Sequence, residues 1–355
     1  MILRLLVVPV ALSFAAVGCS DGAASPASVP SAPGGNGGNG GVSGGSGQGG
    51  TVAGAAGSTD AGGSGAGGSA AGSAGGGPGG GQSGGSAGAA GQAGTTGTRV
   101  RVLAGNLSTG SQQSWTGGEG LRIVAGLHPD VALLQELNYG QNSDAELTAF
   151  AEAALGPGAH AHREPGAAIP NAVLSTYPFV DVGVWVDPEV QNRGFAWARI
   201  DVPGDADLFA VSVHLLTSSP TQRALEATSL VAQLQSAVPP GAMIVVGGDF
   251  NTAFRTEACI TEFSMLFATA PPYPADASGN GNTSANRSKP HDWVLASPLL
   301  FAREIPVAIG GASFAAGLVF DSRVYVPLDD VAPVLVTDSG ANGMQHMAVV
   351  RDFSL

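Results

Sequence analysis

Short segments in which apolar and polar positions alternate follow one another from residue 98 to residue 355. Side chains of an extended chain point alternately to two faces, so this alternation predicts strands with one buried face. Wholly apolar runs, such as residues 131–134, predict strands buried on both faces. Between residues 171 and 214 the turns are short, which favours antiparallel pairing. The expected strands cover residues 100–105, 130–136, 171–175, 179–186, 194–201, 207–214, 243–248, 292–295, 319–326 and 345–353.

Helices are expected over residues 119–127, 143–155, 219–238 and 256–268, and a loop over residues 271–290. The third helix has the clearest pattern. Ser219 can cap it, Pro220 suits its first turn, and Gln222 can complete a capping box. Its apolar residues recur every three or four positions, which predicts one face packed on a sheet. They are Ala224, Ala227, Val231, Leu234 and Val238.

The polar residues that end the strand over residues 243–248 are the most informative in the chain. Asp249 and Asn251 follow two glycines, and residues two apart on an extended chain share a face. Their side chains would therefore enter the same space at the end of a buried strand. A simple turn is the alternative, because Asp and Asn are common turn residues.

Other strands also begin or end with a polar side chain, so a single rim of functional groups is expected. His214 falls on the face of Ala210 and Ser212, opposite the large apolar residues of its strand, which argues against a purely structural histidine. The candidate residues of this rim are Asn106, Glu136, His214, Asp249, Asn251, Asp292 and His346.

These residue types suit hydrolysis of a phosphate ester. A carboxylate can hold a hard divalent cation, neutral or cationic donors can stabilise charge on the phosphate, and a second carboxylate can fix one imidazole tautomer. No serine elbow, phosphate-binding loop or zinc spacing competes with this interpretation. The pair His160 and His162 can bind metal or lie in an exposed loop, and Cys259 is expected to be a buried apolar residue.

Seven short segments in order make residues 98–355 resemble the endonuclease/exonuclease/phosphatase superfamily. They are Asn106-Leu107, residues 130–136, residues 171–175, residues 213–215, residues 248–251, residues 292–295 and His346 with its apolar followers. The resemblance implies an α/β fold, a four-layer α/β/β/α sandwich of the pancreatic deoxyribonuclease type. Two mainly antiparallel sheets would pack face to face, with helices outside.

The resemblance also implies roles for single residues. Glu136 would bind the metal, assisted by Asn106, and the ion would be Mg²⁺, with Mn²⁺ or Ca²⁺ as alternatives. Asp249 would orient the attacking water, and Asn251 would donate to a phosphate oxygen.

The two histidines receive different roles by the same resemblance. His346 would meet the scissile phosphate while Asp292 accepts from its other ring nitrogen, and His214 would lie near the leaving group. Glu164 is a candidate acidic partner for His214. One position departs from the family pattern: Gln345 stands where an aspartate is common, which bears on metal affinity and on the use of a second metal.

The first 97 residues have a different composition. The apolar run over residues 5–18 is too short to span a membrane and suits an export signal. It ends before Cys19 in a way that resembles a bacterial lipoprotein box, with an ordinary cleavage site as the alternative. Residues 20–97 are rich in Gly, Ser and Ala and predict a flexible tether. We therefore expect an exported domain, held at the cell envelope by a lipid on Cys19.

The formal net charge of −13, almost all of it on residues 98–355, argues against tight binding to long nucleic acid. The leading interpretation is a metal-dependent phosphodiester hydrolase, most simply a tethered nuclease that acts as a monomer on nucleic acid or a smaller phosphodiester. Alternatives on the same fold are a phosphatase and a sphingomyelinase-like phospholipid phosphodiesterase, for which residues 263–273 are the candidate membrane-entry segment. An alternative of another class is a catalytically silent adhesion lipoprotein.

Overall fold

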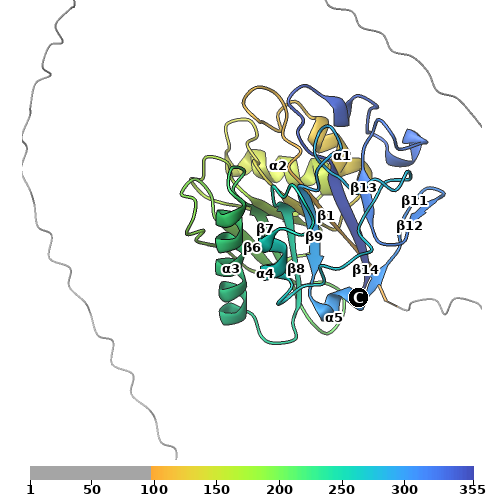
Figure 1. The fold of residues 1–355 in the computed structure, drawn as a ribbon. Helices are drawn as coiled ribbons and strands as arrows, with labels where there is room; N and C mark the ends of the chain where they lie inside the picture. Colours follow the sequence, from red (N-terminus) through yellow and green to blue (C-terminus); the bar gives the residue numbers. More distant parts are fainter. Residues whose placement is uncertain (1–96) are drawn as a thin grey trace, which may run out of the picture. The chain divides into compact units, whose positions relative to one another are not determined.

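Two β-sheets form the centre of the computed structural model, which describes residues 97–355 (Figure 1). The predicted signal segment, Cys19 and almost all of the predicted tether lie outside the described residues. The first sheet has seven strands in the order β10-β14-β1-β2-β4-β3, with β13 also paired to β14. These strands are β1 (Arg99–Gly105), β2 (Val131–Leu134), β3 (His160–Arg163), β4 (Ala172–Ser175), β10 (Glu304–Ile305), β13 (Leu318–Phe320) and β14 (Ala348–Ser354).

The second sheet has five strands in the order β5-β6-β7-β8-β9. Only two strand pairs of the two sheets are parallel, β1 with β2 and β7 with β8, so both sheets are mainly antiparallel as predicted. The strands of this sheet are β5 (Phe179–Trp185), β6 (Phe195–Ile200), β7 (Leu208–His214), β8 (Met243–Asp249) and β9 (Asp292–Ala296).

Helices cover the outer faces of the two sheets, as expected for a four-layer sandwich. Helices α1 (Glu119–Leu127) and α2 (Asp144–Leu155) pack on the first sheet. Helices α3 (Pro220–Ala237) and α4 (Ala258–Phe263) pack on the second, and Figure 1 shows α3 alongside β6 to β8. The short helix α5 (Pro298–Phe301) follows β9.

Alternation along β8 determines which side chains face the other sheet. Val245 joins the core between the sheets, whereas Val246 joins the core under α3 and α4. Asp249, four residues after Val245, therefore falls on the inner face. The alternation that the sequence predicts thus places the carboxylate between the two sheets.

Several predicted elements differ from the structure. Residues 160–163 form the edge strand β3, not a loop, and β4 pairs with β2 and β3 instead of starting the antiparallel series of β5 to β7. The last two strands are shorter than expected, α4 ends at Phe263, and the hairpin of β11 (Val307–Ile309) and β12 (Ala312–Phe314) was not predicted. These segments are short, so their pattern is weak.

The predicted third helix is largely confirmed. Ser219 accepts a hydrogen bond from the Gln222 backbone N–H, although the reciprocal half of a capping box is not formed. Ala224 is half-buried, and Leu230 completes the buried stripe instead. Among residues 97–355, no helix is both long enough and apolar enough to cross a bilayer.

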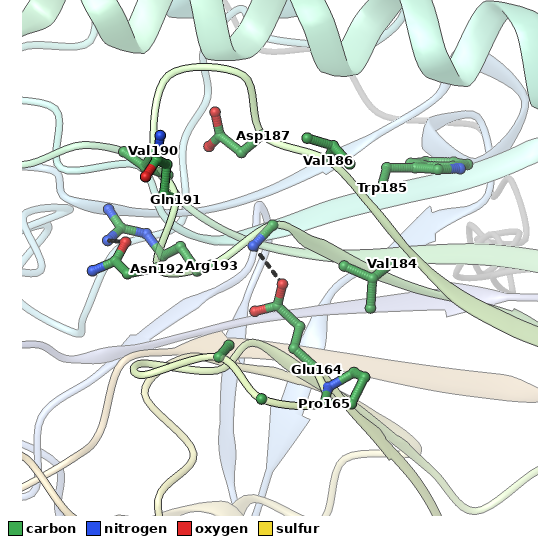
Figure 2. Close-up of a pocket in the computed structure, with 13 residues that line it drawn as sticks. Glu164, Pro165, Val184, Trp185, Val186, Asp187, Val190, Gln191, Asn192 and Arg193 are labelled. Atoms are coloured by element: carbon green, nitrogen blue, oxygen red, sulfur yellow. Dashed lines mark hydrogen bonds between the residues drawn. The ribbon is translucent and has the colours of Figure 1, made fainter. Parts of the chain in front are cut away.

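One buried side chain links the two sheets below the loop that joins β5 and β6. Glu164 follows β3 and accepts hydrogen bonds from the backbone N–H groups of Asn171 and Gly194. Figure 2 shows the second of these bonds. It lines a pocket of about 440 Å³ together with Trp185, Asp187 and Arg193. Because Gly194 leads into β6, this carboxylate ties an edge of the first sheet to the second.

Two glycines before Asp249 let the sheets approach each other. A Cβ atom on Gly247 would lie 2.9 Å from Leu133 Cδ1 of the first sheet. One on Gly248 would lie 2.6 Å from Nε2 of Gln135, which follows β2, and 2.1 Å from the Val213 carbonyl oxygen of the neighbouring strand β7. Gly248 also has a φ of +141°, which other residues rarely adopt. The close contact and the backbone conformation both require glycine at position 248.

We predict that Gly248→Ala lowers the free energy of unfolding by about 3 kcal/mol, since the new methyl group meets a backbone oxygen that cannot move freely. Gly241→Ala is the control, because Gly241 also has a positive φ but an added Cβ would have no neighbour within 4 Å. Its expected cost is about 1 kcal/mol. Urea denaturation measures both, and equal costs would contradict the role assigned to close sheet contact.

Candidate active site

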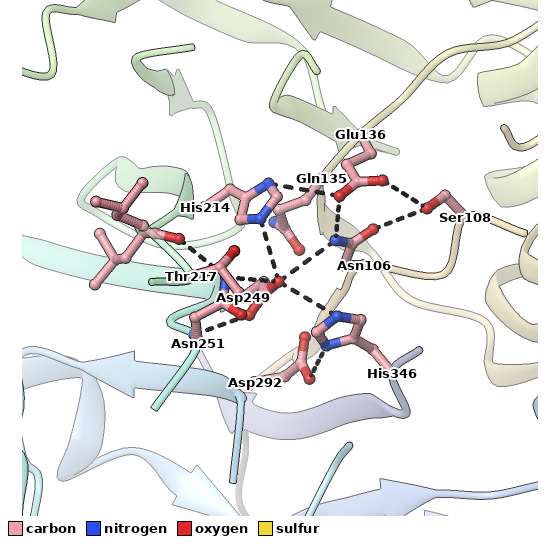
Figure 3. A network of polar contacts seen from close by, with 12 residues as sticks. Asn106, Ser108, Gln135, Glu136, His214, Thr217, Asp249, Asn251, Asp292 and His346 are labelled. Atoms are coloured by element: carbon pink, nitrogen blue, oxygen red, sulfur yellow. Dashed lines mark hydrogen bonds and ion pairs between the residues drawn. The ribbon is translucent and has the colours of Figure 1, made fainter. Parts of the chain in front are cut away.

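Three neighbouring strands of the second sheet place three polar side chains in one row. The register pairs His214 of β7 with Asp249 of β8, and Asp249 with Asp292 of β9. All three are buried and lie at the ends of their strands. The row follows directly from strand pairing, and Figure 3 shows its side chains converging.

The first sheet supplies the other half of the site. Asn106 follows β1 and Glu136 follows β2, the parallel neighbour of β1. His346 precedes β14, which pairs with β1 from the other side. The structure therefore brings together the predicted rim residues from six strands and both sheets.

A single carboxylate oxygen lies at the centre of this arrangement. Asp249 Oδ2 is 3.3 Å from His214 Nε2 and 3.3 Å from His346 Nε2 (Figure 3). Burial raises the pKa of Asp249 to about 7, although the charge on His346 opposes the shift. A carboxyl group with this pKa can exchange a proton near neutral pH.

The two imidazoles next to Asp249 have opposite charge preferences. Burial alone would lower the pKa of His346, but the negative charges of Asp249 and Asp292 outweigh it and raise the pKa to about 10. Asp292 Oδ2 lies 2.9 Å from His346 Nδ1. Burial, assisted by the charges of Arg193 and His346, holds the pKa of His214 well below its usual value. At neutral pH the site therefore has one cationic and one neutral imidazole.

Glu136 is the most accessible carboxylate of the group, with 14% of its side chain exposed. Its Oε1 accepts from Asn106 Nδ2 at 3.0 Å and its Oε2 accepts from Ser108 Oγ at 3.0 Å. Glu136 itself has a φ of +50°, a conformation that is uncommon for this residue type. Local backbone strain of this kind is typical of functional sites.

Asn251 is held in place by its own neighbours. Its amide Nδ2 donates to the Leu215 carbonyl oxygen at 2.9 Å and to Asp249 Oδ2 at 3.2 Å, and its backbone N–H donates to Asp249 Oδ1 at 2.8 Å. The predicted shared face of Asp249 and Asn251 is confirmed. The bond from the Asn251 backbone N–H to the Asp249 side chain is typical of an Asx turn. The segment is therefore a turn and also part of the site.

Two sets of side chains in the described part of the chain could hold a metal ion. Atoms of Asp249, Asp292 and His346 lie within 4.8 Å of one another. Without an ion, the raised pKa of His346 favours its protonated form, so a metal ion bound there would have to displace that proton. Glu136 with Asn106 is the better fit, because Mg²⁺ prefers oxygen ligands and retains water molecules. His214 Nδ1, buried and without a hydrogen-bond partner, lies 4.0 Å from Glu136 Oε1, so an unpaired nitrogen adjoins that carboxylate.

Glu164 is not the acidic partner of His214. Its carboxylate accepts hydrogen bonds from the backbone N–H groups of Asn171 and Gly194, beside the pocket shown in Figure 2. The carboxylates nearest to the His214 ring are those of Asp249 and Glu136. The prediction was wrong because a carboxylate in a polar sequence segment does not reveal that it will bond to backbone N–H groups.

The remaining candidates lie outside this site. His162 Nε2 lies 3.1 Å from the Gly183 carbonyl oxygen, and the His160 ring packs near Phe179. Cys259 is buried as predicted, and burial raises its thiol pKa to about 12. In residues 263–273, the aromatic rings of Phe263 and Phe267 belong to the core, so this segment presents no exposed aromatic hairpin.

Sequence reasoning missed two residues that support the site. Ser108 bonds both Asn106 and Glu136, and it lies two residues after Asn106, so the argument used for Asp249 and Asn251 could have found it. Arg193 acts through the backbone: its guanidinium donates to the carbonyl oxygens of His214 and Leu215. No sequence pattern marks such a contact.

Residues 121–313, more than half of the chain, match the model of the Endonuclease/Exonuclease/phosphatase family. The chain belongs to this family of phosphoester hydrolases. The match includes Glu136, His214, Asp249, Asn251 and Asp292. Asn106 and His346 lie outside it and join the site only through the fold.

Solved structures support the fold. An endonuclease/exonuclease/phosphatase from Bacteroides vulgatus is 14% identical, with a TM-score of 0.50 over 73% of this chain and 99% of that chain. A functionally unknown conserved protein from Enterococcus faecalis V583 is 12% identical, with a TM-score of 0.51 over 72% of this chain and 100% of that chain. No curated protein matches the chain.

Next to the site, Glu226 of α3 is a second buried carboxyl group that favours its protonated form. Both carboxyl oxygens accept from the Leu216 backbone N–H, at 3.1 and 2.9 Å. Burial raises the pKa of Glu226 to about 8, and the neighbouring Asp187 adds to the shift. Leu216 follows the His214-Leu215 segment that Arg193 holds, so this carboxyl group supports the same loop.

We predict that Glu226→Gln gains stability relative to the unchanged protein as the pH rises from about 4 to about 8. In this range folded Glu226 keeps a proton that Glu226 of the unfolded chain has released. The free energy of unfolding of the unchanged protein therefore falls as the pH rises. Glutamine keeps an acceptor and cannot ionise. Urea denaturation at a series of pH values, in EDTA, measures the difference. Parallel pH curves for the two proteins would contradict the raised pKa.

Proposed function

We propose that the chain is a divalent-metal-dependent phosphodiester hydrolase, and most simply a membrane-tethered extracytoplasmic nuclease. The observation that carries the proposal is the position of Asp249 Oδ2, 3.3 Å from both a neutral and a cationic imidazole. Hydrolysis of a phosphodiester needs a proton acceptor for water and a cationic donor for the phosphate, and these groups supply both.

In the proposed step, Asp249 aligns a water molecule and takes one of its protons while the water oxygen bonds to phosphorus. The bond from phosphorus to the leaving oxygen breaks, that oxygen takes a proton from solvent, and Asp249 releases its own proton to solvent. Cationic His346, oriented by Asp292, donates to a phosphate oxygen throughout. His214 presents its unpartnered Nδ1 to the same space.

Glu136 and Asn106 would hold the metal ion, for which we propose Mg²⁺, with Mn²⁺ or Ca²⁺ as alternatives. When bound, the ion would neutralise charge on a phosphate oxygen. Ser108 fixes the Glu136 carboxylate from one side, and Asn106 fixes it from the other. The protein thus holds the carboxylate in a set orientation before any ion arrives.

The acidic surface bears on the substrate. A chain with a net charge of −13 has little electrostatic attraction for long nucleic acid, so low-affinity, salt-dependent action is expected on such substrates. The same observation favours smaller phosphoesters as a second candidate class. Plasmid DNA, bis(p-nitrophenyl) phosphate and phospholipid, each assayed with and without Mg²⁺ or Mn²⁺, separate these classes.

We predict that Glu136→Ala and His346→Ala each lower kcat by at least about 100-fold, because each removes a charged group next to the reacting phosphate. Gln345→Asp should retain activity, because Asp292 and not residue 345 orients His346. His160→Ala, on the edge strand β3, is the control and should behave like the unchanged protein. Full activity of His346→Ala on the substrate panel would refute the mechanism, and hydrolysis of no substrate at any metal would favour a silent adhesion domain.

We further propose that a lipid on Cys19 holds the domain at the cell envelope. Cys19→Ala should therefore move the exported protein from the membrane fraction to the soluble fraction, without changing the specific activity of the domain. Fractionation with immunoblotting, together with incorporation of labelled palmitate, measures the effect. A membrane-bound Cys19→Ala protein would show that another segment provides the anchor.

A further inference from the structure

A cleft of about 470 Å³ extends from the active site past His346 and Asn251. Its walls contain no carboxylate, which is unexpected for a chain with a net charge of −13. Basic and amide side chains predominate instead. The residues that carry the argument are Asn286, Lys289, Arg223 and Gln345.

Lys289 is the only lysine in the sequence, and within residues 97–355 its ammonium group forms no ion pair with a carboxylate. Arg223 also lines the cleft, but its charge is matched by Glu257, with Nη2 2.6 Å from Glu257 Oε2. Arg223 also donates to two backbone carbonyl oxygens. Apart from His346, which is assigned to the scissile phosphate, Lys289 is therefore the cation of this cleft that is available to a ligand.

The backbone of Lys289 is firmly held. Its N–H donates to Ser284 Oγ at 3.0 Å, and its carbonyl oxygen accepts from the N–H groups of Thr283 and Ser284 at 2.8 and 3.0 Å. These bonds close residues 283–289 into a loop. The lysine side chain thus extends from a fixed base.

The same loop is hydrogen-bonded to the segments that carry His346 and Asp292. Ser284 forms a β-bridge with His346, and the Met347 N–H donates to the Thr283 carbonyl oxygen at 2.7 Å. The Thr283 hydroxyl oxygen accepts from the Asp292 N–H at 2.8 Å. Lys289 is consequently positioned relative to both His346 and Asp292.

Gln345 contributes by its lack of charge. It is exposed in the wall of the cleft, next in sequence to His346. A carboxylate there would repel an anion bound near Lys289. With glutamine, the wall keeps a hydrogen-bonding group and leaves the positive charge uncompensated.

We infer that this cleft binds a second phosphate of the same substrate, through Lys289 with help from the amide of Asn286. The inference rests on the proposed function and specifies its substrate class: short phosphodiesters that carry a terminal phosphate. A single available cation suits one additional phosphate. Long nucleic acid would require a row of cations along the cleft.

Three dinucleotides test the inference: thymidylyl-thymidine without a terminal phosphate, with a 5′-phosphate and with a 3′-phosphate, assayed with Mg²⁺ or Mn²⁺. We expect kcat/KM of the unchanged protein to be about fivefold higher for one phosphorylated form, as for an exposed charge pair. Equal kcat/KM values for all three would overturn the inference.

Variants of the cleft residues test whether the preference for a phosphorylated dinucleotide arises in the cleft. Lys289→Met and Gln345→Asp should each bring the ratio of kcat/KM values close to one, and Lys289→Arg should retain most of it. Arg303→Gln is the matched control, since Arg303 is exposed, has no carboxylate partner among residues 97–355 and does not line the cleft. A preference that survives in Lys289→Met would overturn the inference.

A second measurement separates this inference from the proposed function. If the unchanged protein hydrolyses none of the dinucleotides, the nuclease proposal fails, and acetylation of Lys289 by an N-hydroxysuccinimide ester then decides the inference. Since the chain has no other lysine, mass spectrometry of one peptide reports the rate. Inorganic pyrophosphate in EDTA should slow acetylation at least about twofold relative to chloride of equal ionic strength. An unchanged rate would overturn the inference.

Discussion

The site depends on one carboxyl group, that of Asp249, which exchanges a proton while it is buried between the two sheets. Only 1% of the Asp249 side chain is exposed, and burying an unpaired charge is unfavourable. Cationic His346 offsets that cost, and Asp292 in turn stabilises the imidazolium from its other side. Gly247 and Gly248 allow the sheets to come close enough for these groups to meet. The chemistry of the site therefore requires close packing of the two sheets.

The buried part of the site and the more open part have different characters. The half around Asp249, Asp292 and His346 is buried and internally bonded, which suits proton handling. The half around Glu136 is more open and has oxygen ligands, which suits a hydrated cation. The cleft with Lys289 extends from the buried part, and a substrate whose second phosphate binds Lys289 would lie along it in one orientation.

The strands and most of the site residues could be predicted from period-two patterns, whereas the four-layer arrangement of the sheets was implied by the family resemblance. Polar residues at strand ends, such as Asp249 and His214, stand out against an apolar background, and the register then aligns them. Contacts that depend on the backbone could not be predicted. Arg193 and Glu164 bond to carbonyl and N–H groups, which every residue has, and strand β3 has no apolar alternation to reveal it. Ser108 was predictable from its spacing to Asn106 and was overlooked.

The pairing of β1 with β14 has a consequence for when the protein becomes active. These strands come from opposite ends of the described chain, and they carry Asn106 and His346 into the same site. A chain whose last strand has not yet docked lacks its cationic histidine and the neighbour that fixes the Lys289 loop. Catalysis would thus begin only after folding is complete. A partly synthesised chain would be chemically silent, and a hydrolase of this design needs no inhibitor during its own synthesis.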